Sequence, residues 1–343
     1  MHARKSYDVI IGSYGTANEP TINWLTFYPT EGEFREIAHY KGVENPSYLT
    51  LNKNRTGLYV ISEVEEGMIH SFHIDRQTKT IAHLNAKSTQ GAPCYVTLDA
   101  DERYVLSANY GGGSVVSHHL KKDGSLGTPS KPIVHGNTHS NKPSHIHTIR
   151  QVPHTDYYIA TDLGCDKLYV LTFSKNGQIQ LVRTIDVESA SGPRHICFHP
   201  TKNRMYVVSE FKSCVFTFSY NNNLSDIHCV QVSPTLPKQF KGENFGADIH
   251  MTSEGKFLFT SNRGHHSLTT FRISPDGMID PIAYTPSGGE WPRNFIILPD
   301  SPYIIVLNEH TDNIVGMKMD ANGELQHITA PFTIPKPVCI QTF

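Results

Sequence analysis

A short segment recurs seven times along this chain of 343 residues, and it limits the possible folds more than any other feature. Each copy has a small or variable residue, usually a proline after it, and then a run of apolar residues. The copies are NPSYLTL, APCYVTL, KPSHIHT, GPRHICF, GADIHMT, WPRNFII and KPVCIQT, which begin at residues 45, 92, 142, 192, 246, 291 and 336. The prolines, with Ala247 in place of the fifth, are 45 to 54 residues apart. This period is that of a β-propeller blade and is too long for most helical repeats.

The sequence between these segments predicts further strands. A turn rich in Asn, Asp, Gly and Pro follows the opening run, as in LNKNRTG or FHPTKNR. A second apolar run comes next, such as YVLSAN or MYVVSE, and then a third, such as KLYVLTF or CVFTFSY. These runs are short, rich in Val, Ile, Tyr, Phe and Thr, and broken at regular intervals, which is typical of strands.

The two ends of the chain complete the pattern. It starts within a unit, with YDVIIGS as a second strand and INWLTFYP as a third, and it finishes on KPVCIQTF, a first strand. The C-terminal strand is therefore expected to join the N-terminal strands in a seventh blade, which closes the ring and leaves few strand edges exposed. The sequence predicts an all-β fold, a seven-bladed β-propeller with four-stranded blades, in a single domain that spans residues 1–343.

Composition and charge narrow the possible partners. The chain is 38% hydrophobic and 18% charged, which is ordinary for a globular protein. Its formal net charge of −2 gives no reason to expect nucleic acid or an anionic membrane as a partner. The N-terminus lacks a signal-peptide apolar region, the apolar runs are too short to cross a bilayer, and the scattered cysteines include no C-x-x-C pair. We therefore expect a soluble cytoplasmic protein, and the sequence does not indicate its oligomeric state.

Polar residues occupy positions where a propeller strand is expected to be apolar. In the alignment of the seven units, the second strand ends on Ser13, Glu63, Asn109, Asp162, Glu210, Asn262 and Asn308. Carboxylates that converge on one central channel repel each other unless cations lie among them. The candidate cations are Arg194, Arg263 and Arg293, with His145, His147, His195 and His250. Arginine suits the planar recognition of a carboxylate or phosphate, so an anionic small molecule is the expected ligand.

The sequence gives little support for a metal site or for serine-esterase chemistry. His145 and His147 are two residues apart and face one side of a regular strand, but no third or fourth ligand follows at a recognisable spacing. No G-x-S-x-G nucleophile motif is present. Arg194 and His195 are adjacent, so they cannot both face the channel from a regular strand. Arg194 is the expected catalytic residue, with His195 supporting it or reaching the channel through a local kink.

Five segments carry a family resemblance that covers nearly the whole chain. They are ANYGGGSVV, PSHIHTI with TDLGCDKLYVLTF, GPRHICFHP, GADIHMTSEGKFLFTSNRGHHSLTTF and PRNF. In this order, and in register with the seven units, they resemble the signature segments of the seven-bladed propeller lactonases. That family includes a bacterial 6-phosphogluconolactonase and a fungal 3-carboxy-cis,cis-muconate lactonizing enzyme. The resemblance implies an enzyme that opens or closes a lactone ring without a metal or other cofactor.

The resemblance also implies individual site residues. The muconate enzyme's pattern of one histidine, two arginines and one glutamate falls on His147, Arg194, Glu210 and Arg263, with His147 chosen over His145 from its spacing to Asp162. Residues that match the phosphogluconolactonase branch, and are expected to bind substrate, are His145, Asp162, His195, Asp248, His250, Asn262 and Arg293. The histidine of the GPRH segment favours this hydrolytic branch.

These residues suit the hydrolysis of a lactone, and the expected reaction converts 6-phosphogluconolactone to 6-phosphogluconate in the pentose phosphate pathway. His147 or Glu210 is expected to transfer the proton, and Arg194 to stabilise the oxyanion. Arg263 and Arg293 are expected to bind anionic groups of the substrate. The alternatives are a lactonase or cycloisomerase for another carboxylated or sugar lactone, a calcium-dependent propeller lactonase, and a non-catalytic propeller that binds peptides or proteins.

Overall fold

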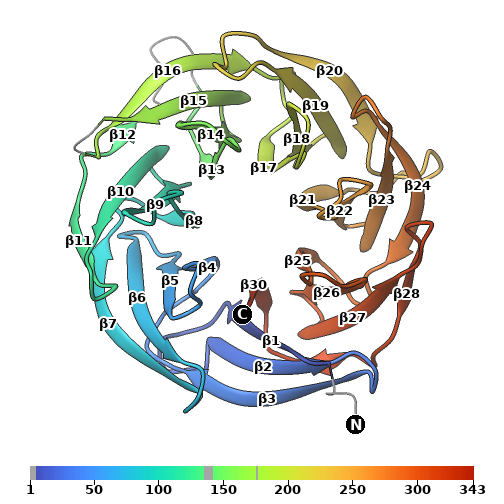
Figure 1. Cartoon of the computed structure of the whole chain (residues 1–343). Helices are drawn as coiled ribbons and strands as arrows, with labels where there is room; N and C mark the ends of the chain where they lie inside the picture. Colours follow the sequence, from blue (N-terminus) through green and yellow to red (C-terminus); the bar gives the residue numbers. More distant parts are fainter. Residues whose placement is uncertain (1–4, 135–141, 175–176) are drawn as a thin grey trace. The chain divides into compact units, whose positions relative to one another are not determined.

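Every regular element that the computed structural model describes is a β-strand. The description covers residues 5–134, 142–174 and 177–343. Antiparallel pairing groups the strands of these ranges into seven sheets, and each sheet is one blade (Figure 1). The blade boundaries follow the repeat found in the sequence.

Six blades are built from consecutive strands, and the seventh combines strands from both chain ends. The combined blade has the order β3-β2-β1-β30, with β1 at Tyr7–Ser13, β2 at Ile22–Tyr28, β3 at Glu33–Tyr40 and β30 at Pro337–Thr342. The next three blades are β4 (Leu49–Leu51), β5 (Gly57–Ser62), β6 (Met68–Asp75) and β7 (Thr80–Ser88); β8 (Pro93–Leu98), β9 (Tyr104–Asn109), β10 (Ser114–Leu120) and β11 (Leu126–Pro129); and β13 (Ile146–Gln151), β14 (Tyr157–Asp162), β15 (Lys167–Phe173) and β16 (Ile179–Asp186).

The last three blades lie in the C-terminal half of the chain. They are β17 (Pro193–Phe198), β18 (Arg204–Ser209), β19 (Cys214–Tyr220) and β20 (Ile227–Pro234); β21 (Phe245–Met251), β22 (Phe257–Arg263), β23 (Ser267–Ile273) and β24 (Ile279–Pro286); and β25 (Pro292–Ile297), β26 (Tyr303–Asn308), β27 (Asn313–Met319) and β28 (Leu325–His327). Two short strands, β12 (Ile133–Val134) and β29 (Phe332–Thr333), pair with β10 and β27 in addition.

The predicted fold class, a seven-bladed β-propeller with four-stranded blades, is confirmed. β30, the C-terminal strand, pairs with β1 and so completes the blade that the N-terminal strands begin. Within the described ranges, no helix is long and apolar enough to cross a membrane.

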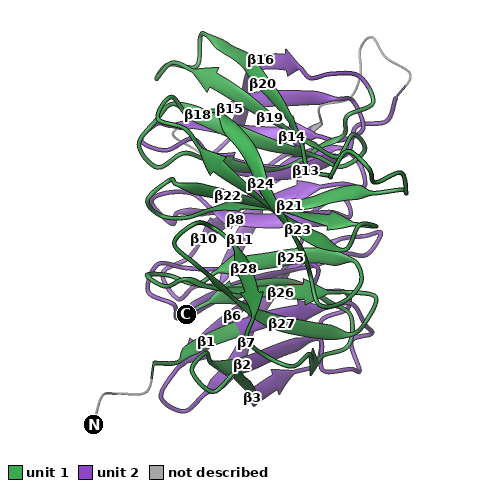
Figure 2. Ribbon diagram, turned by 90° about the vertical axis from the view of Figure 1, so that its right-hand side faces the viewer, with its two compact units in different colours: residues 1–9, 25–35, 190–342 green, residues 10–24, 36–189, 343 purple. Residues whose placement is uncertain are grey.

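By compactness the chain divides into two units, drawn in green and purple in Figure 2. Unit 1 comprises residues 1–9, 25–35 and 190–342, and unit 2 comprises residues 10–24, 36–189 and 343. The three complete blades of unit 1 begin with β17, β21 and β25, and those of unit 2 begin with β4, β8 and β13. The single domain expected from the sequence stays a prediction.

Apolar side chains fill the space between neighbouring blades within each unit. In unit 1, one cluster joins Tyr206 of β18 to Leu258 and Phe271 of the next blade, and a second joins Phe259 to Phe295. The second strands are buried along most of their length, which explains why their sequences are continuous apolar runs rather than alternating ones. These packed sheets give the polar residues on the first two strands of each blade a rigid support.

A one-residue register shift recurs near the start of the first strand in five blades. It lies between Pro93 and Tyr95, between 146 and 148, between Pro193 and Ile196, between Gly246 and Ile249, and between Pro292 and Asn294. Such a bulge inserts one unpaired residue and interrupts the alternation of side chains between the two faces of a sheet. In four of these blades the bulge holds unusual polar residues, namely His147, Arg194 with His195, Asp248 and Arg293.

Candidate active site

Glu210 is the centre of a charged cluster in unit 1. Its Oε2 lies 3.0 Å from Nε of Arg194 and 3.1 Å from Nη2 of Arg263. Arg194 is the second residue of β17, and Arg263 is the last residue of β22 in the next blade. The structure therefore brings together three of the four residues expected to be catalytic.

The position of Glu210 differs by one residue from the sequence alignment. β18 ends at Ser209 and β5 ends at Ser62, so Glu210 and Glu63 lie just past their strands, and the expected strand-end positions are wrong. Ser209 pairs with Pro193 as Asn308 pairs with Pro292, which fixes the correct register. We call the residue that follows Ser13, Ser62, Asn109, Asp162, Ser209, Asn262 and Asn308 the post-strand position, although in β22 this residue is still the last one of the strand. Its occupants along the chain are Tyr14, Glu63, Tyr110, Leu163, Glu210, Arg263 and Glu309.

The side chain of Arg263 is only 6% exposed and has contacts on several sides. Nη2 also donates to the carbonyl oxygen of Gly246 at 3.1 Å, and the guanidinium lies 5.4 Å from the ring centroid of Trp291 and 5.9 Å from that of Phe245. Gly246 is required by close packing, because a Cβ there would lie 2.2 Å from the carbonyl oxygen of Ser209. The arginine is thus fixed in place by a backbone carbonyl, a carboxylate and two aromatic rings.

Burial and charge act in opposite directions on the cluster. Burial alone would raise the pKa of the Glu210 carboxyl, but the positive charges of Arg263, Arg194 and Arg293 outweigh it and lower the pKa instead. Burial, together with the charge of Arg194, lowers the pKa of Arg263 to about 9, so this guanidinium stays charged at neutral pH. The cluster therefore holds its full charges at neutral pH.

A second ion pair lies in the next blade. Nη1 of Arg293, on β25, is 3.8 Å from Oε2 of Glu309, which occupies the post-strand position after β26. Both side chains are half-buried, with 18% and 15% of their surface exposed. Together with Arg194, Glu210 and Arg263, the pair makes a group of three arginines and two glutamates with an excess of positive charge. Such an excess suits an anionic ligand.

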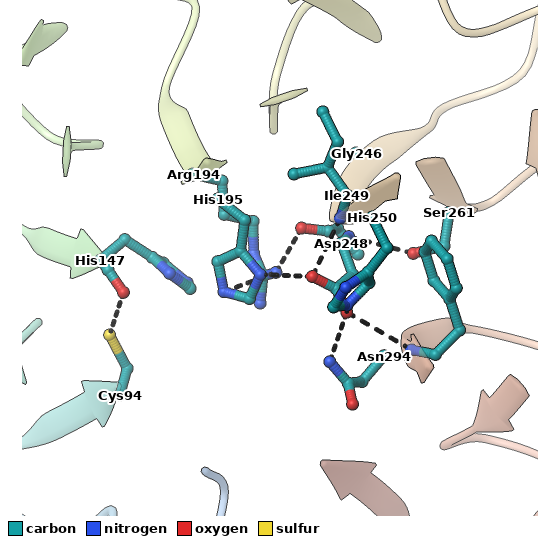
Figure 3. A network of polar contacts seen from close by, with 12 residues as sticks. Cys94, His147, Arg194, His195, Gly246, Asp248, Ile249, His250, Ser261 and Asn294 are labelled. Carbon is teal, nitrogen blue, oxygen red and sulfur yellow. Dashed lines mark hydrogen bonds and ion pairs between the residues drawn. The ribbon is translucent and has the colours of Figure 1, made fainter. Parts of the chain in front are cut away.

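His195 lies beside Arg194 in the bulge of β17, which confirms the local kink predicted for this pair. Both side chains are buried. Nδ1 of His195 is 2.7 Å from Oδ1 of Asp248, and Nε2 is 3.4 Å from Nη1 of Arg194 (Figure 3). Because the carboxylate accepts from Nδ1–H, Nε2 is free of a proton and accepts from the arginine. Burial and the charge of Arg194 lower the pKa of His195 to about 4, so the ring is neutral at neutral pH.

Asp248 is the buried centre of this network (Figure 3). Its Oδ2 accepts from Nε2 of His250 at 2.9 Å and from the side-chain amide of Asn294, and Oδ1 accepts from the backbone N–H of Ile249. Burial would raise the pKa of Asp248, but the two histidines outweigh it and hold the pKa well below its usual range. Asp248 and His195 therefore satisfy each other and orient Arg194, and the substrate contacts predicted for them are not supported.

Two further residues expected to bind substrate are structural. Asp162 is fully buried and accepts from the hydroxyls of Ser144 and Tyr169 and from the backbone N–H of His145 and Cys165. Its carboxylate thus connects the start of β13 to the turn that follows β14.

Asn262 is also fully buried. Its side-chain amide donates to the carbonyl oxygen of Thr235 and to the hydroxyl of Thr269. Neither Asp162 nor Asn262 offers a surface to a ligand, so the predicted contacts are not supported.

His145 and His147 belong to unit 2. The ring of His145 stacks on Tyr110 at 4.2 Å between centroids, and Nδ1 lies 2.9 Å from the carbonyl oxygen of that tyrosine. His147 lies in the bulge of β13, is buried, and accepts from the Cys94 thiol at its backbone carbonyl. The bulge between 146 and 148 interrupts the regular alternation that would place the two imidazoles on one face of the strand. In the described ranges, no group of three or more His, Cys, Asp or Glu residues is arranged to hold a metal ion.

Sequence reasoning missed Glu309 and Asn294. Glu309 follows a strand-end asparagine, in the same way as Arg263 follows Asn262, so a correct register would have shown it. Asn294 lies at the bulge of β25 and binds Asp248 across the blade boundary, a contact that no local pattern indicates.

Comparison with known proteins agrees with this architecture. A family model described as "Lactonase, 7-bladed beta-propeller" matches residues 8–342. A protein of Bacillus subtilis strain 168 named 6-phosphogluconolactonase is 32% identical over 341 residues, which cover 96% of this chain and 97% of the relative.

Solved structures extend the likeness. A putative 6-phosphogluconolactonase of Bacteroides fragilis has 26% identity and a TM-score of 0.89, and covers 100% of this chain and 99% of its own. A protein of Pseudomonas aeruginosa described as a periplasmic gluconolactonase has 24% identity and a TM-score of 0.91, over 98% and 99% of the two chains. This second likeness extends to the fold alone.

Proposed function

Because the chain belongs to the seven-bladed β-propeller lactonase family, we propose that it hydrolyses 6-phosphoglucono-δ-lactone to 6-phosphogluconate. The reaction belongs to the pentose phosphate pathway, and we place the enzyme in the cytoplasm. The name of the Bacillus subtilis relative supports this substrate, and the excess of arginine over glutamate in the charged cluster supports an anionic one.

The observation that carries the proposal is the shared oxygen of Glu210. Oε2 lies 3.0 Å from Nε of Arg194 and 3.1 Å from Nη2 of Arg263, so one carboxylate oxygen is shared by two buried arginines. With 18% of its surface exposed, the side chain is open to a small ligand. A partly exposed carboxylate that two arginines hold in place can orient a water molecule for attack on a carbonyl carbon.

The proposed reaction needs one water and no cofactor. The oxygen of water bonds to the lactone carbonyl carbon as a base removes a proton, and the negative charge on the carbonyl oxygen is stabilised by Arg194. The tetrahedral intermediate then expels the ring oxygen, which takes up a proton and becomes a hydroxyl group. The new carboxylic acid ionises at neutral pH, so each turnover releases one proton to the solvent.

The base is either Glu210 or His147, and the pH profile separates them. The lowered pKa of Glu210 keeps it ionised in mild acid, so catalysis by Glu210 stays constant as the pH falls from about 8 to about 5. A decrease in activity over this range would instead indicate a histidine base. The variants E210Q and H147N then show which side chain the profile reports.

The test of the function is proton release from freshly made 6-phosphoglucono-δ-lactone, measured against the spontaneous rate in weakly buffered solution. Unphosphorylated glucono-δ-lactone is run beside it, and we expect the phosphorylated substrate to be preferred because arginines bind phosphate strongly. EDTA is expected to leave the rate unchanged. A rate equal to the spontaneous background with both lactones contradicts the proposal and favours a binding protein.

A further inference from the structure

Four aromatic rings form a row next to the charged cluster of unit 1. They are Phe211, Phe245, Trp291 and His310, and we call them the aromatic row. Phe211 meets Phe245 edge to face at 6.4 Å between centroids, and Phe245 meets Trp291 at 5.8 Å. Trp291 stacks on His310 at 4.5 Å with an interplanar angle of 9°. Three successive blades thus contribute to one continuous aromatic surface.

The row is tied to the charged cluster through the chain itself. Phe211 directly follows Glu210, His310 directly follows Glu309, and Trp291 is separated from Arg293 by one proline. The guanidinium of Arg263 lies over the rings of Trp291 and Phe245. The rings of Trp291 and Phe245 therefore border the charged cluster at Arg263.

The folded core does not account for the row. Phe211 is 48% exposed, His310 is exposed, and Phe245 and Trp291 are half-buried. Gly192 makes room for Phe211, because a Cβ at Gly192 would lie 2.5 Å from the phenylalanine ring. Most of the other large exposed apolar side chains of the described residues lie on the outer strands, far along the sequence from charged site residues. Aromatic surface beside a few polar groups is the usual lining of a small-molecule site.

We propose that the aromatic row binds the C–H face of a six-membered sugar lactone while the arginines of the charged cluster bind its anionic group. This inference rests on the lactonase function proposed above. Sugar C–H groups carry slight positive charge and pack well on the electron-rich face of an aromatic ring, as ring edges do. The row then orients the lactone so that its carbonyl carbon lies near Glu210.

The stereochemistry of the sugar gives the inference its specificity. In a gluco-configured δ-lactone the ring substituents are equatorial, so both faces present C–H groups to a ring. A galacto configuration places the hydroxyl at C4 on one face and interrupts this contact. We therefore expect the enzyme to prefer 6-phosphoglucono-δ-lactone to 6-phosphogalactono-δ-lactone, with the preference made by the aromatic row.

The test compares wild type with F211A, using both phosphorylated lactones in the proton-release assay. Phe211 is exposed enough for its loss to leave the fold intact, which circular dichroism checks. We expect F211A to raise KM for the gluco substrate roughly tenfold, with little change in kcat, and to reduce the gluco preference. F211Y keeps the aromatic ring and is expected to stay within about twofold of wild type. V232A, an exposed apolar residue on outer strand β20, is the matched control and should match wild type.

The outcomes separate the two proposals. If wild type fails to accelerate either lactone, the proposed function is wrong. If wild type is active but F211A keeps the KM and the gluco preference of V232A, the aromatic row does not bind the sugar and the inference is overturned. Preference for an alkyl-substituted δ-lactone over the sugar lactones also overturns the inference, because the aromatic row then binds an apolar substituent and not the C–H face of a sugar.

Discussion

Glu210 in unit 1 and Glu63 in unit 2 both occupy the post-strand position, each one residue beyond a second strand. Glu210 is held by two buried arginines, whereas Glu63 accepts a hydrogen bond from the hydroxyl of Tyr14 at 2.9 Å. The neighbouring post-strand residues follow the same division, with Arg263 and Glu309 in unit 1 but uncharged Tyr110 in unit 2. One repeated scaffold position thus belongs to a cluster of arginines and glutamates in unit 1 and accepts a hydrogen bond from a tyrosine hydroxyl in unit 2.

Two buried carboxylates extend the comparison. Asp248 in unit 1 binds two histidines, one of which touches Arg194, whereas Asp162 in unit 2 binds hydroxyls and backbone N–H groups. Both are inaccessible to ligand, yet only Asp248 connects to the charged cluster. Burial of a polar residue is therefore a poor guide to function, and what its partners contact decides its role.

The largest effect is expected from R194A. The substitution removes a buried cation from Glu210 and the proposed oxyanion donor, so kcat should fall roughly 100- to 1000-fold. The proton-release assay measures the loss, and thermal unfolding shows whether the fold is kept. R194K is the matched variant and should remain impaired, because an ammonium cannot reproduce the planar contacts to Glu210, Ala247 and His195. Full activity in R194A would remove Arg194 from the mechanism.

The next effect concerns the free energy of unfolding, which is expected to depend on pH through the protonation of His195. The unfolded chain takes up a proton on this residue near its ordinary pKa of about 6.5, whereas the folded protein resists protonation down to about 4. The stability that depends on neutral His195 is complete above about pH 6.5 and decreases toward pH 4, by up to about 3 kcal/mol. Urea unfolding at a series of pH values gives the free energy of unfolding as a function of pH. Between about pH 6.5 and pH 4, this free energy should change less steeply with pH for H195Q than for wild type. Equal slopes would mean that His195 titrates alike in both states.

D162N tests whether buried carboxylates in unit 2 are purely structural. An amide at this position replaces one acceptor oxygen with an NH2 group, which cannot accept from the surrounding donors, so the free energy of unfolding should decrease by about 1 to 3 kcal/mol. The kcat of the folded protein should remain that of wild type. A large loss of kcat with normal stability would restore the predicted substrate-binding role of Asp162.

The sequence predicted the scaffold well because a blade is a local pattern repeated seven times, and strand runs and turns are short-range signals. It singled out Arg194, Glu210 and Arg263, which the structure brings into contact, because each departs from an apolar pattern. It did not show that Asp162, Asn262 and Asp248 are buried among hydrogen-bond donors, because a polar residue looks the same in a sequence whether it meets a ligand or a buried donor. The roles of Asn294 and the aromatic row were not predicted, because contacts between blades join residues about one repeat apart.

The smallest effect, and the sharpest control, is expected from E63Q. The glutamine amide keeps an oxygen to accept from the Tyr14 hydroxyl, so stability should change by less than about 0.5 kcal/mol and activity by less than about twofold. E210Q makes the same chemical change at the equivalent position, but it removes a charge that Arg194 and Arg263 share. Measured side by side, E210Q should lose roughly 100-fold in kcat while E63Q loses almost nothing. Similar losses in both would show that the post-strand position serves the same purpose in the two units, and that the arginines do not distinguish the active glutamate.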